Sequence, residues 1–252
     1  MDLAAKAEQL RKLHGGPDML VLPNAWDVAS ARLFAKMGYP AIATTSAGVA
    51  NSLGWPDHEQ IPPDEMFAAV KRIASAVDVP VTADIEGGYG LEPQDLVNRL
   101  IDAGAAGMNV EDSDHRGDGV LVDAGKQATR LRAVVEAGKK TGVPLVLNAR
   151  VDVFVREYGS EGGRVHEAIR RAQHYRQAGA DCLYPILVSD EDVVRQLVDG
   201  IDGPINFMYL PDGPSLTRLR ELGVRRVTFA GGLARMALAH VEEWLGSIDP
   251  VR

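Results

Sequence analysis

Apolar runs of strand length recur along the chain, and each is followed by a segment with helical spacing. Eight such runs lie at residues 19–25, 41–46, 80–86, 107–112, 144–152, 181–187, 204–210 and 225–232. They show little apolar/polar alternation, which is typical of strands buried on both faces of a parallel sheet. Between them, residues such as Leu96, Leu100 and Ala103 recur at helical spacing. The pattern predicts eight β/α units.

Glycine-bearing turns separate the predicted helices from the strands that follow. Examples are "MGYPAI", "AGAAGMNV", "TGVPLVL" and "LGVRRVTF". Glycine suits the left-handed position after a helix, and a following proline prevents the helix from continuing. These turns support the alternation of helices and parallel strands.

Eight β/α units in a chain of 252 residues predict an α/β fold of the closed (β/α)8 TIM-barrel type. The helix expected at residues 3–14 would precede the first strand as an N-terminal lid. An open, doubly wound sheet is the alternative. Because no Ser/Pro-rich linker or charge block divides the sequence, we expect one domain over residues 1–252.

Composition narrows the functional classes. The sequence is 46% hydrophobic and 25% charged, without a basic-then-apolar leader or an apolar run long enough to span a membrane, so we expect a cytoplasmic protein with no membrane partner. A net charge of −8 with dispersed Lys and Arg disfavours nucleic acid as a partner. The single cysteine, Cys182, lies in an apolar run, and we expect a structural role for it.

In TIM barrels the functional groups gather at the carboxyl ends of the strands. In this sequence the expected strand ends are rich in acids and amides. The side chains delivered there are Asn24, Trp26, Asp27, Thr44, Thr45, Ser46, Asp84, Glu86, Asn109, Glu111, Asp112, Asn148, Arg150, Asp152, Tyr184 and Asn206, with Asp57 in the loop after the second strand.

Three of these acids are expected to converge. Asp84 and Glu86 are two apart and share a strand face, and Glu111 ends the neighbouring strand. Converging like charges need a cation, shared protons or water. Because no Cys cluster or paired His is evident, all-oxygen ligands favour Mg²⁺, with Mn²⁺ as the other choice, over zinc.

Several motifs in order resemble the isocitrate lyase and phosphoenolpyruvate mutase superfamily over roughly residues 18–240. They are "LPNAWDVASARLFAKMGYPAIATTSAGVANSLGWPD", "ADIEGGYG", "NVEDS", "NARVDVF" and "GADCLYP". The resemblance implies a (β/α)8 barrel, often a tetramer with the last helix exchanged between neighbours. It also implies Mg²⁺ chemistry on 2-oxo or 2-hydroxy carboxylates.

The resemblance also assigns roles to individual positions. Asp84, Glu86 and Glu111 take the metal positions, with Asp57 as an outer carboxylate. Substrate contacts are implied for Ser46, Ala47, Gly48 and Arg150, and Thr44 and Asn206 are added as neighbouring strand-end groups. For Arg150 the alternative is a structural ion pair with Asp152 or Glu111. His115 and Tyr89 are the expected proton-handling groups, with Tyr184 and His58 as further candidates.

The chain departs from the superfamily pattern in the loop after the fourth strand. That loop reads "EDSDHRGDGVLVD" and lacks the Lys-Lys-Cys-Gly-His gate of the isocitrate and methylisocitrate lyases, as well as the mutase's Lys and Asn–Ser pair. In this loop His115 and Arg116 could supply a proton donor or a positive charge that holds the substrate. The alternative is that both are solvated loop residues. Glu86 replaces the usual Asp, and Ile186 stands where relatives often carry a polar residue.

We therefore expect a Mg²⁺-dependent lyase that cleaves a C–C bond next to a carbonyl in a small 2-oxo or 2-hydroxy (di)carboxylate through an enolate. One alternative is a P–C bond enzyme that binds phosphate at Gly231 and Gly232. The other is a non-catalytic barrel that binds a metabolite. A homo-oligomer, either dimer or tetramer, is expected, and the sequence leaves open whether the helix at 233–246 packs on its own barrel.

Overall fold

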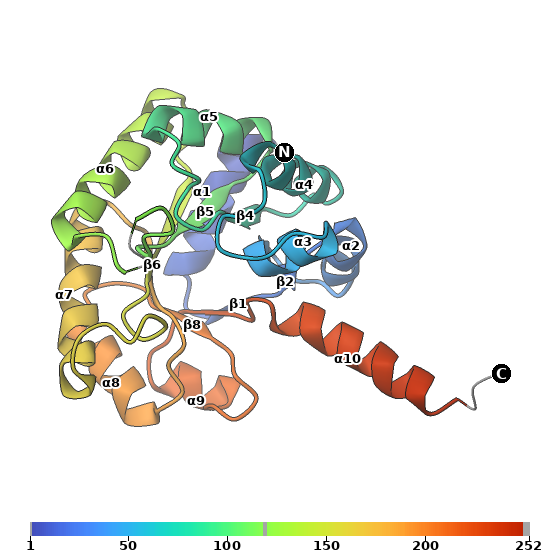
Figure 1. Ribbon diagram of the computed structural model, residues 1–252. Helices are drawn as coiled ribbons and strands as arrows, with labels where there is room; N and C mark the ends of the chain where they lie inside the picture. Colours follow the sequence, from blue (N-terminus) through green and yellow to red (C-terminus); the bar gives the residue numbers. More distant parts are fainter. Residues whose placement is uncertain (1, 118–119, 249–252) are drawn as a thin grey trace.

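A ring of short parallel strands surrounded by helices forms the body of the protein. The structure, a computed structural model, describes residues 2–117 and 120–248 (Figure 1). The strands within these residues are β1 (Leu20–Leu22), β2 (Asn24–Ala25), β3 (Ile42–Thr44), β4 (Val81–Asp84), β5 (Gly107–Val110), β6 (Val146–Val151), β7 (Cys182–Pro185), β8 (Asn206–Met208) and β9 (Arg226–Thr228).

The strands close into a cylinder. β2 to β7 pair in sequence order, and β1, β9 and β8 form a second parallel group. The two groups join where β1 continues into β2 and where Leu183 bridges Ile205 in parallel. The predicted (β/α)8 barrel is therefore confirmed, and the open doubly wound sheet is excluded.

The first predicted strand, residues 19–25, is divided in the structure. β1 pairs with β9 and β2 pairs with β3, with Pro23 between them. Proline has no N–H to donate, so a continuous ladder cannot run through it, whereas its carbonyl still accepts from the Ala43 amide at 3.0 Å. One apolar run thus pairs with two different strands, β9 through its first half and β3 through its second half, and so closes the barrel.

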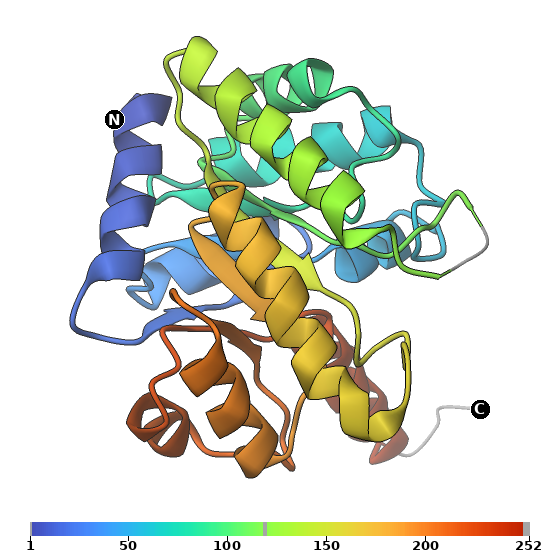
Figure 2. The ribbon, with the colours of Figure 1, turned by 90° about the vertical axis from the view of Figure 1, so that its left-hand side faces the viewer.

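Helices surround the strands on the outside, as the 3.6-residue periodicity predicts (Figure 2). They are α1 (Leu3–Gly15), α2 (Val28–Lys36), α3 (Ser46–Ser52), α4 (Pro63–Ser75), α5 (Pro93–Asp102), α6 (Ala124–Lys140), α7 (Arg164–Gln177), α8 (Glu191–Gly200), α9 (Leu216–Glu221) and α10 (Gly232–Gly246), with a 3₁₀ turn at Glu161–Gly163. Several predicted glycine turns are present. For example, Gly104 after α5 has φ 75° and Gly179 after α7 has φ 105°.

Helix α1 covers the end of the barrel at which the strands begin. Its Ala7 and Leu10 pack in one apolar cluster with Leu20, Leu22 and Val146. Gly107 permits this approach, because a Cβ there would lie 2.9 Å from Leu10 Cδ2 and 2.7 Å from the Val146 carbonyl oxygen. The predicted N-terminal lid is confirmed, and it lies at the end opposite to the strands' carboxyl ends.

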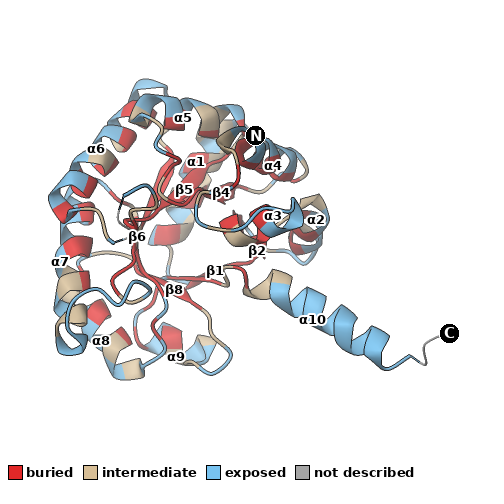
Figure 3. Cartoon of the chain, in the orientation of Figure 1, coloured by how far each residue is buried: buried red, intermediate tan, exposed pale blue. Residues whose placement is uncertain are grey.

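Helix α10 extends away from the barrel, with none of its residues buried (Figures 1 and 3). Its apolar side chains are exposed, including Met236 at 64%, Leu238 at 65% and Trp244 at 60%. The last helix therefore does not pack along its own barrel. Among the described residues, no helix is both long enough and apolar enough to cross a membrane.

Candidate active site

Acidic side chains from β4 and β5 meet at the carboxyl ends of the strands, as the sequence predicts. Asp84 is the last residue of β4 and is buried. Its Oδ2 accepts from the Ser46 amide at 3.1 Å and from Ser46 Oγ at 3.0 Å. Its own amide donates to Thr44 Oγ1 at 2.9 Å. Thr44 and Ser46 therefore hold Asp84 in place from the end of β3 and the start of α3.

Glu86 lies just beyond β4 with a left-handed backbone, φ 52°. Its carboxylate accepts from Tyr89 Oη at 2.9 Å and from the Glu59 amide at 2.6 Å. Burial, followed by the charges of Asp57 and Glu111, raises the pKa of Glu86 to about 8, against the effect of the two hydrogen bonds. In the absence of a cation, ionising Glu86 would place another negative charge beside Asp57 and Glu111, which is unfavourable.

This shift sets the pH dependence of the metal-free protein. Between the ordinary pKa of 4.5 and the folded value of about 8, native Glu86 keeps a proton that the unfolded chain has lost. The free energy of unfolding should therefore fall as the pH rises through that window, by about 1.4 kcal/mol per pH unit from this group. Glu86→Gln should make the fall shallower, as measured by urea denaturation at several pH values with a chelator present, while the raised pKa of Glu111 still contributes in both proteins. Equal pH slopes for the wild type and Glu86→Gln would contradict the assignment, and Glu136→Gln on exposed α6 is the matched control.

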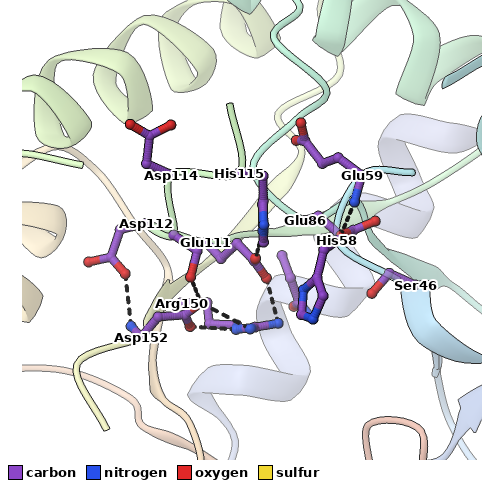
Figure 4. A network of polar contacts seen from close by, with 12 residues as sticks. Ser46, His58, Glu59, Glu86, Glu111, Asp112, Asp114, His115, Arg150 and Asp152 are labelled. Atoms are coloured by element: carbon purple, nitrogen blue, oxygen red, sulfur yellow. Dashed lines mark hydrogen bonds and ion pairs between the residues drawn. The ribbon is translucent and has the colours of Figure 1, made fainter. Parts of the chain in front are cut away.

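Glu111 follows β5 and joins the acids to two basic groups (Figure 4). Arg150 Nη1 lies 2.5 Å from Glu111 Oε2, and His115 Nε2 contacts Glu111 Oε1. Burial raises the pKa of Glu111, while Arg150 lowers it and Asp152 raises it. Burial lowers the pKa of His115, but its hydrogen bond and charge interaction with Glu111 outweigh that effect and raise it. His115 is thus half-buried beside the acids and is not a solvated loop residue.

Arg150 makes both of the structural ion pairs that the sequence offered as alternatives to substrate binding. Besides Glu111, it contacts Asp152 through Nε at 2.6 Å and Nη2 at 3.0 Å. A guanidinium has more N–H donors than these contacts use, so the side chain keeps hydrogen-bonding capacity for a ligand. Arg116, by contrast, is exposed and pairs with Glu59 at 3.0 Å.

Asp57 and His58 come from the loop between α3 and α4. Asp57 Oδ1 is buried and has no hydrogen-bond partner within the protein. The His58 ring lies 5.5 Å from the His115 ring, centroid to centroid. His58, Glu86 and His115 each offer a ligand atom within 4.8 Å of the others. The expectation of a site without paired histidines is therefore corrected: the two residues are far apart in sequence and meet only in the fold.

Other sequence candidates lie elsewhere in the barrel. Asn206 begins β8, is fully buried and bonds Thr228 Oγ1 at 3.1 Å. Its amide is thus engaged inside the barrel, and the prediction that it ends a strand at the mouth is wrong. Thr228 Oγ1 also lies 3.4 Å from Tyr184 Oη, whose pKa burial raises to about 12. Cys182 is fully buried in β7, as expected.

Ala47 and Gly48 lie in the first turn of α3. A groove of about 310 Å³ at the foot of α10 is lined by both residues together with Trp26, Gly231 and Arg235. Gly231, which also lines the groove, precedes α10, and Gly232 is the first residue of that helix. The substrate-binding stretch predicted at 46–48 therefore adjoins the projecting helix.

Asp112 has a structural function that the sequence did not reveal. Its carboxylate is fully buried and accepts from the Asp152 amide at 2.8 Å, Arg171 Nη1 at 3.0 Å and Tyr175 Oη at 2.7 Å. Asp152 directly follows β6, and Arg171 and Tyr175 lie on α7, so Asp112 ties the end of the strand to the helix. Arg171 and Tyr175 are four residues apart and share one face of α7. This spacing is the sequence signal from which a buried acidic partner such as Asp112 could have been predicted.

Comparison with known proteins agrees with this arrangement. The chain is 33% identical to the 2-methylisocitrate lyase of Escherichia coli over 185 residues, which are 69% of this chain and 60% of that enzyme. A crystal structure of a candidate phosphonomutase from Burkholderia cenocepacia superimposes with a TM-score of 0.89 at 35% identity, covering 96% of this chain and 99% of the other. A 2,3-dimethylmalate lyase, described as a member of the PEP mutase/isocitrate lyase superfamily, superimposes with a TM-score of 0.84 at 27% identity, covering 98% and 90%.

The family match extends over nearly the whole chain. The sequence profile described as phosphoenolpyruvate phosphomutase matches residues 10–248. Its span includes every strand of the barrel and all the acids at the strand ends. With the ordered motifs and the barrel geometry, this chain belongs to the phosphoenolpyruvate phosphomutase family within the PEP mutase/isocitrate lyase superfamily, whose related members named above are lyases and mutases.

Proposed function

We propose that the protein is a Mg²⁺-dependent lyase that cleaves the C–C bond next to a carbonyl in a small 2-oxo or 2-hydroxy (di)carboxylate through an enolate. The observation that carries the proposal is the meeting of Asp84, Glu86 and Glu111 on adjacent strands, with a pKa of about 8 at Glu86. The lyase relatives support the reaction class.

The residues at the site fit a hard divalent cation. Asp84, Glu86 and Glu111 supply oxygen donors, and Asp57 Oδ1 is a buried oxygen without a protein partner. Glu111 pairs with Arg150, but neither Asp84 nor Glu86 forms an ion pair within the described residues, and such acids favour cation binding. Mg²⁺ or Mn²⁺ suits carboxylate ligands. When bound, such an ion supplies an electrophile for negative charge on the substrate's oxygen atoms.

The protein's own groups would then bind and orient the substrate. A substrate carboxylate would bind at the first turn of α3. Because the Ser46 amide donates to Asp84 and the Gly48 amide to Thr45 Oγ1, we propose that the Ala47 amide makes this contact. Arg150, held by Glu111 and Asp152, would use its remaining N–H groups on a second carboxylate or oxo oxygen. Both partners fix the guanidinium before the substrate arrives, which reduces the entropy lost on binding.

His115 is the proposed proton donor. Its hydrogen bond and charge interaction with Glu111 raise the pKa of His115 against the effect of burial, and the ring lies near the charges of Glu86 and Glu59. Tyr89 is a weaker acid, because burial and Glu86 raise its pKa far above the ordinary value. We propose that Tyr89 mainly orients Glu86 through its hydroxyl group.

A Mg²⁺-dependent screen tests the proposal. The expected result is pyruvate release from oxaloacetate or a substituted malate, detected by coupled reduction of pyruvate and lost when a chelator is added. Release of pyruvate and phosphate from phosphonopyruvate instead would establish the P–C enzyme, which the similarity to the candidate phosphonomutase favours. Mg²⁺-dependent oxalate binding without turnover of any compound would indicate a metabolite-binding barrel.

The exposed apolar face of α10 supports a homo-oligomeric enzyme. Met236, Leu238, Val241, Trp244 and Leu245 leave more than half of each side chain exposed, between 52% and 65%. A continuous apolar face of this kind marks an interaction surface. We propose that it packs on another copy in a dimer or tetramer, and sedimentation equilibrium giving a single 27.1 kDa species would contradict this.

A further inference from the structure

We propose that His58, Glu86 and His115 form a mixed nitrogen–oxygen site for a divalent transition-metal ion, such as Mn²⁺, Co²⁺ or Zn²⁺. The proposal rests on the proposed function for the location of Glu86 in the pocket. The ion would be an alternative occupant to Mg²⁺, because His115 cannot act as proton donor through a ring nitrogen that binds a metal ion. The site differs in the ligands: two imidazoles join a carboxylate. Neither histidine belongs to the motifs that define the acidic strand ends.

The three side chains come from three separate loops and converge on one point. His58 precedes α4, Glu86 follows β4 and His115 follows β5. Their ligand atoms lie within 4.8 Å of one another. Bonds of about 2.1 Å to one ion place ligand atoms roughly 3 to 3.5 Å apart, so the distances between ligand atoms must shorten by up to about 1.5 Å. His58 is exposed on a surface loop, so its side chain has room to move inward.

Left-handed backbone conformations gather in the segments that carry His58 and Glu86. Left-handed φ angles are uncommon for residues other than glycine and tend to gather at functional sites. In the described residues this region is adopted by His58 (69°), Glu59 (55°), Glu86 (52°) and Tyr89 (57°), and otherwise only by Glu157, Leu187 and Ala230. More than half of these conformations therefore lie in the two segments that supply His58 and Glu86.

Hydrogen bonds orient two of the ligands. Glu111 contacts the His115 ring, and a carboxylate bonded to a metal-binding histidine typically fixes its orientation. Tyr89 and the Glu59 amide hold Glu86. The buried, unpartnered Asp57 Oδ1 adds negative potential beside Glu86.

The ligand types determine which ion is preferred. Imidazole nitrogen suits first-row transition metals, whereas Mg²⁺ prefers oxygen and keeps its water. Three protein ligands leave coordination positions open, as in catalytic rather than structural sites. The pocket would therefore bind Co²⁺ or Zn²⁺ more tightly than Mg²⁺ in the absence of substrate.

Titration of the full-length, tag-free protein with Co²⁺ tests the proposal. We expect visible d–d absorption bands at one ion per chain, and a dissociation constant below that for Mg²⁺ measured by calorimetry. His58→Ala should weaken Co²⁺ binding by about 10- to 100-fold. His174→Ala, on the exposed face of α7, is the matched control and should leave Co²⁺ binding unchanged. Thermal denaturation of each metal-free variant checks that it is folded.

The outcomes separate this proposal from the proposed function. Unchanged Co²⁺ affinity in folded His58→Ala would overturn the mixed-ligand site, whatever Mg²⁺ and oxalate do. Loss of Co²⁺ binding in His58→Ala, together with a failure of Mg²⁺-dependent oxalate binding in the wild type, would support the mixed-ligand site and refute the enolate chemistry. Equal affinities of the wild type for Co²⁺ and Mg²⁺ would also contradict the proposal.

Discussion

Replacing Asp84 with asparagine should lower kcat/KM on the lyase substrate by about 100- to 1,000-fold and abolish Mg²⁺-dependent oxalate binding. Asp84 ends β4, where it faces the other acids and fixes Ser46 through two hydrogen bonds. The neutral amide keeps the volume of the side chain but loses its charge. The proposed cation would lose a ligand, and Ser46 would lose an ionised acceptor. The substitution therefore affects both metal binding and the position of the proposed substrate-binding stretch.

The measurements are steady-state kinetics and calorimetry with Mg²⁺ and oxalate. The control is Asp78→Asn, an exposed acid in the loop before β4 that should behave as the wild type. An unchanged melting temperature in Asp84→Asn would show that the loss is local. Activity within about threefold of the wild type would refute the metal role of Asp84, because a lost ligand costs far more.

Asp112→Ala should lower the free energy of unfolding by about 3 to 5 kcal/mol, the largest effect on stability that we expect from a single side chain. The carboxylate is fully buried and joins β6 to α7 through the Asp152 amide, Arg171 and Tyr175. Without it, the buried Arg171 guanidinium keeps Glu167 at 2.8 Å, the Val122 carbonyl at 2.8 Å and the Tyr175 hydroxyl oxygen at 3.3 Å, and loses its buried carboxylate partner. The Tyr175 hydroxyl would lose its carboxylate acceptor.

Urea denaturation in the presence of Mg²⁺ would measure this change. Glu191→Ala removes an exposed ion pair with Arg218 and is the matched control, because surface pairs contribute about 1 kcal/mol or less. If Asp112→Ala and Glu191→Ala lower the urea midpoint equally, the buried network is not a major source of stability.

The periodicity of the sequence was sufficient to predict the barrel, because each apolar run has one strand's length and each helix ends at a recognisable turn. It could not reveal the division at Pro23, because the apolar pattern does not show that the residues before and after Pro23 pair with different strands. It also could not place α10. The helix has an apolar face, but whether that face packs on its own barrel depends on the direction in which the chain leaves β9, and no local pattern encodes that direction.

The site was predictable to the extent that strand order determines it. Asp84 and Glu111 end neighbouring strands, so barrel geometry alone brings them together. The approach of His58 to His115 depends on the conformations of two loops, one with left-handed residues at His58 and Glu59, and no sequence period specifies these. Asn206 was misplaced for a related reason: the apolar run at 204–210 is longer than β8, so the end of the strand could not be located from hydrophobicity.

The division of the first strand also affects how the chain can fold during synthesis. β2 finds its partner β3 about 20 residues later, whereas β1 must wait for β9, about 200 residues downstream. At typical elongation rates of 5–20 residues per second, that delay is roughly 10 to 40 s. Leu20 and Leu22 would remain unpaired through that interval, with α1 as the nearest apolar surface able to cover them. The N-terminal lid would then protect a nascent strand edge from aggregation before it covers the finished barrel.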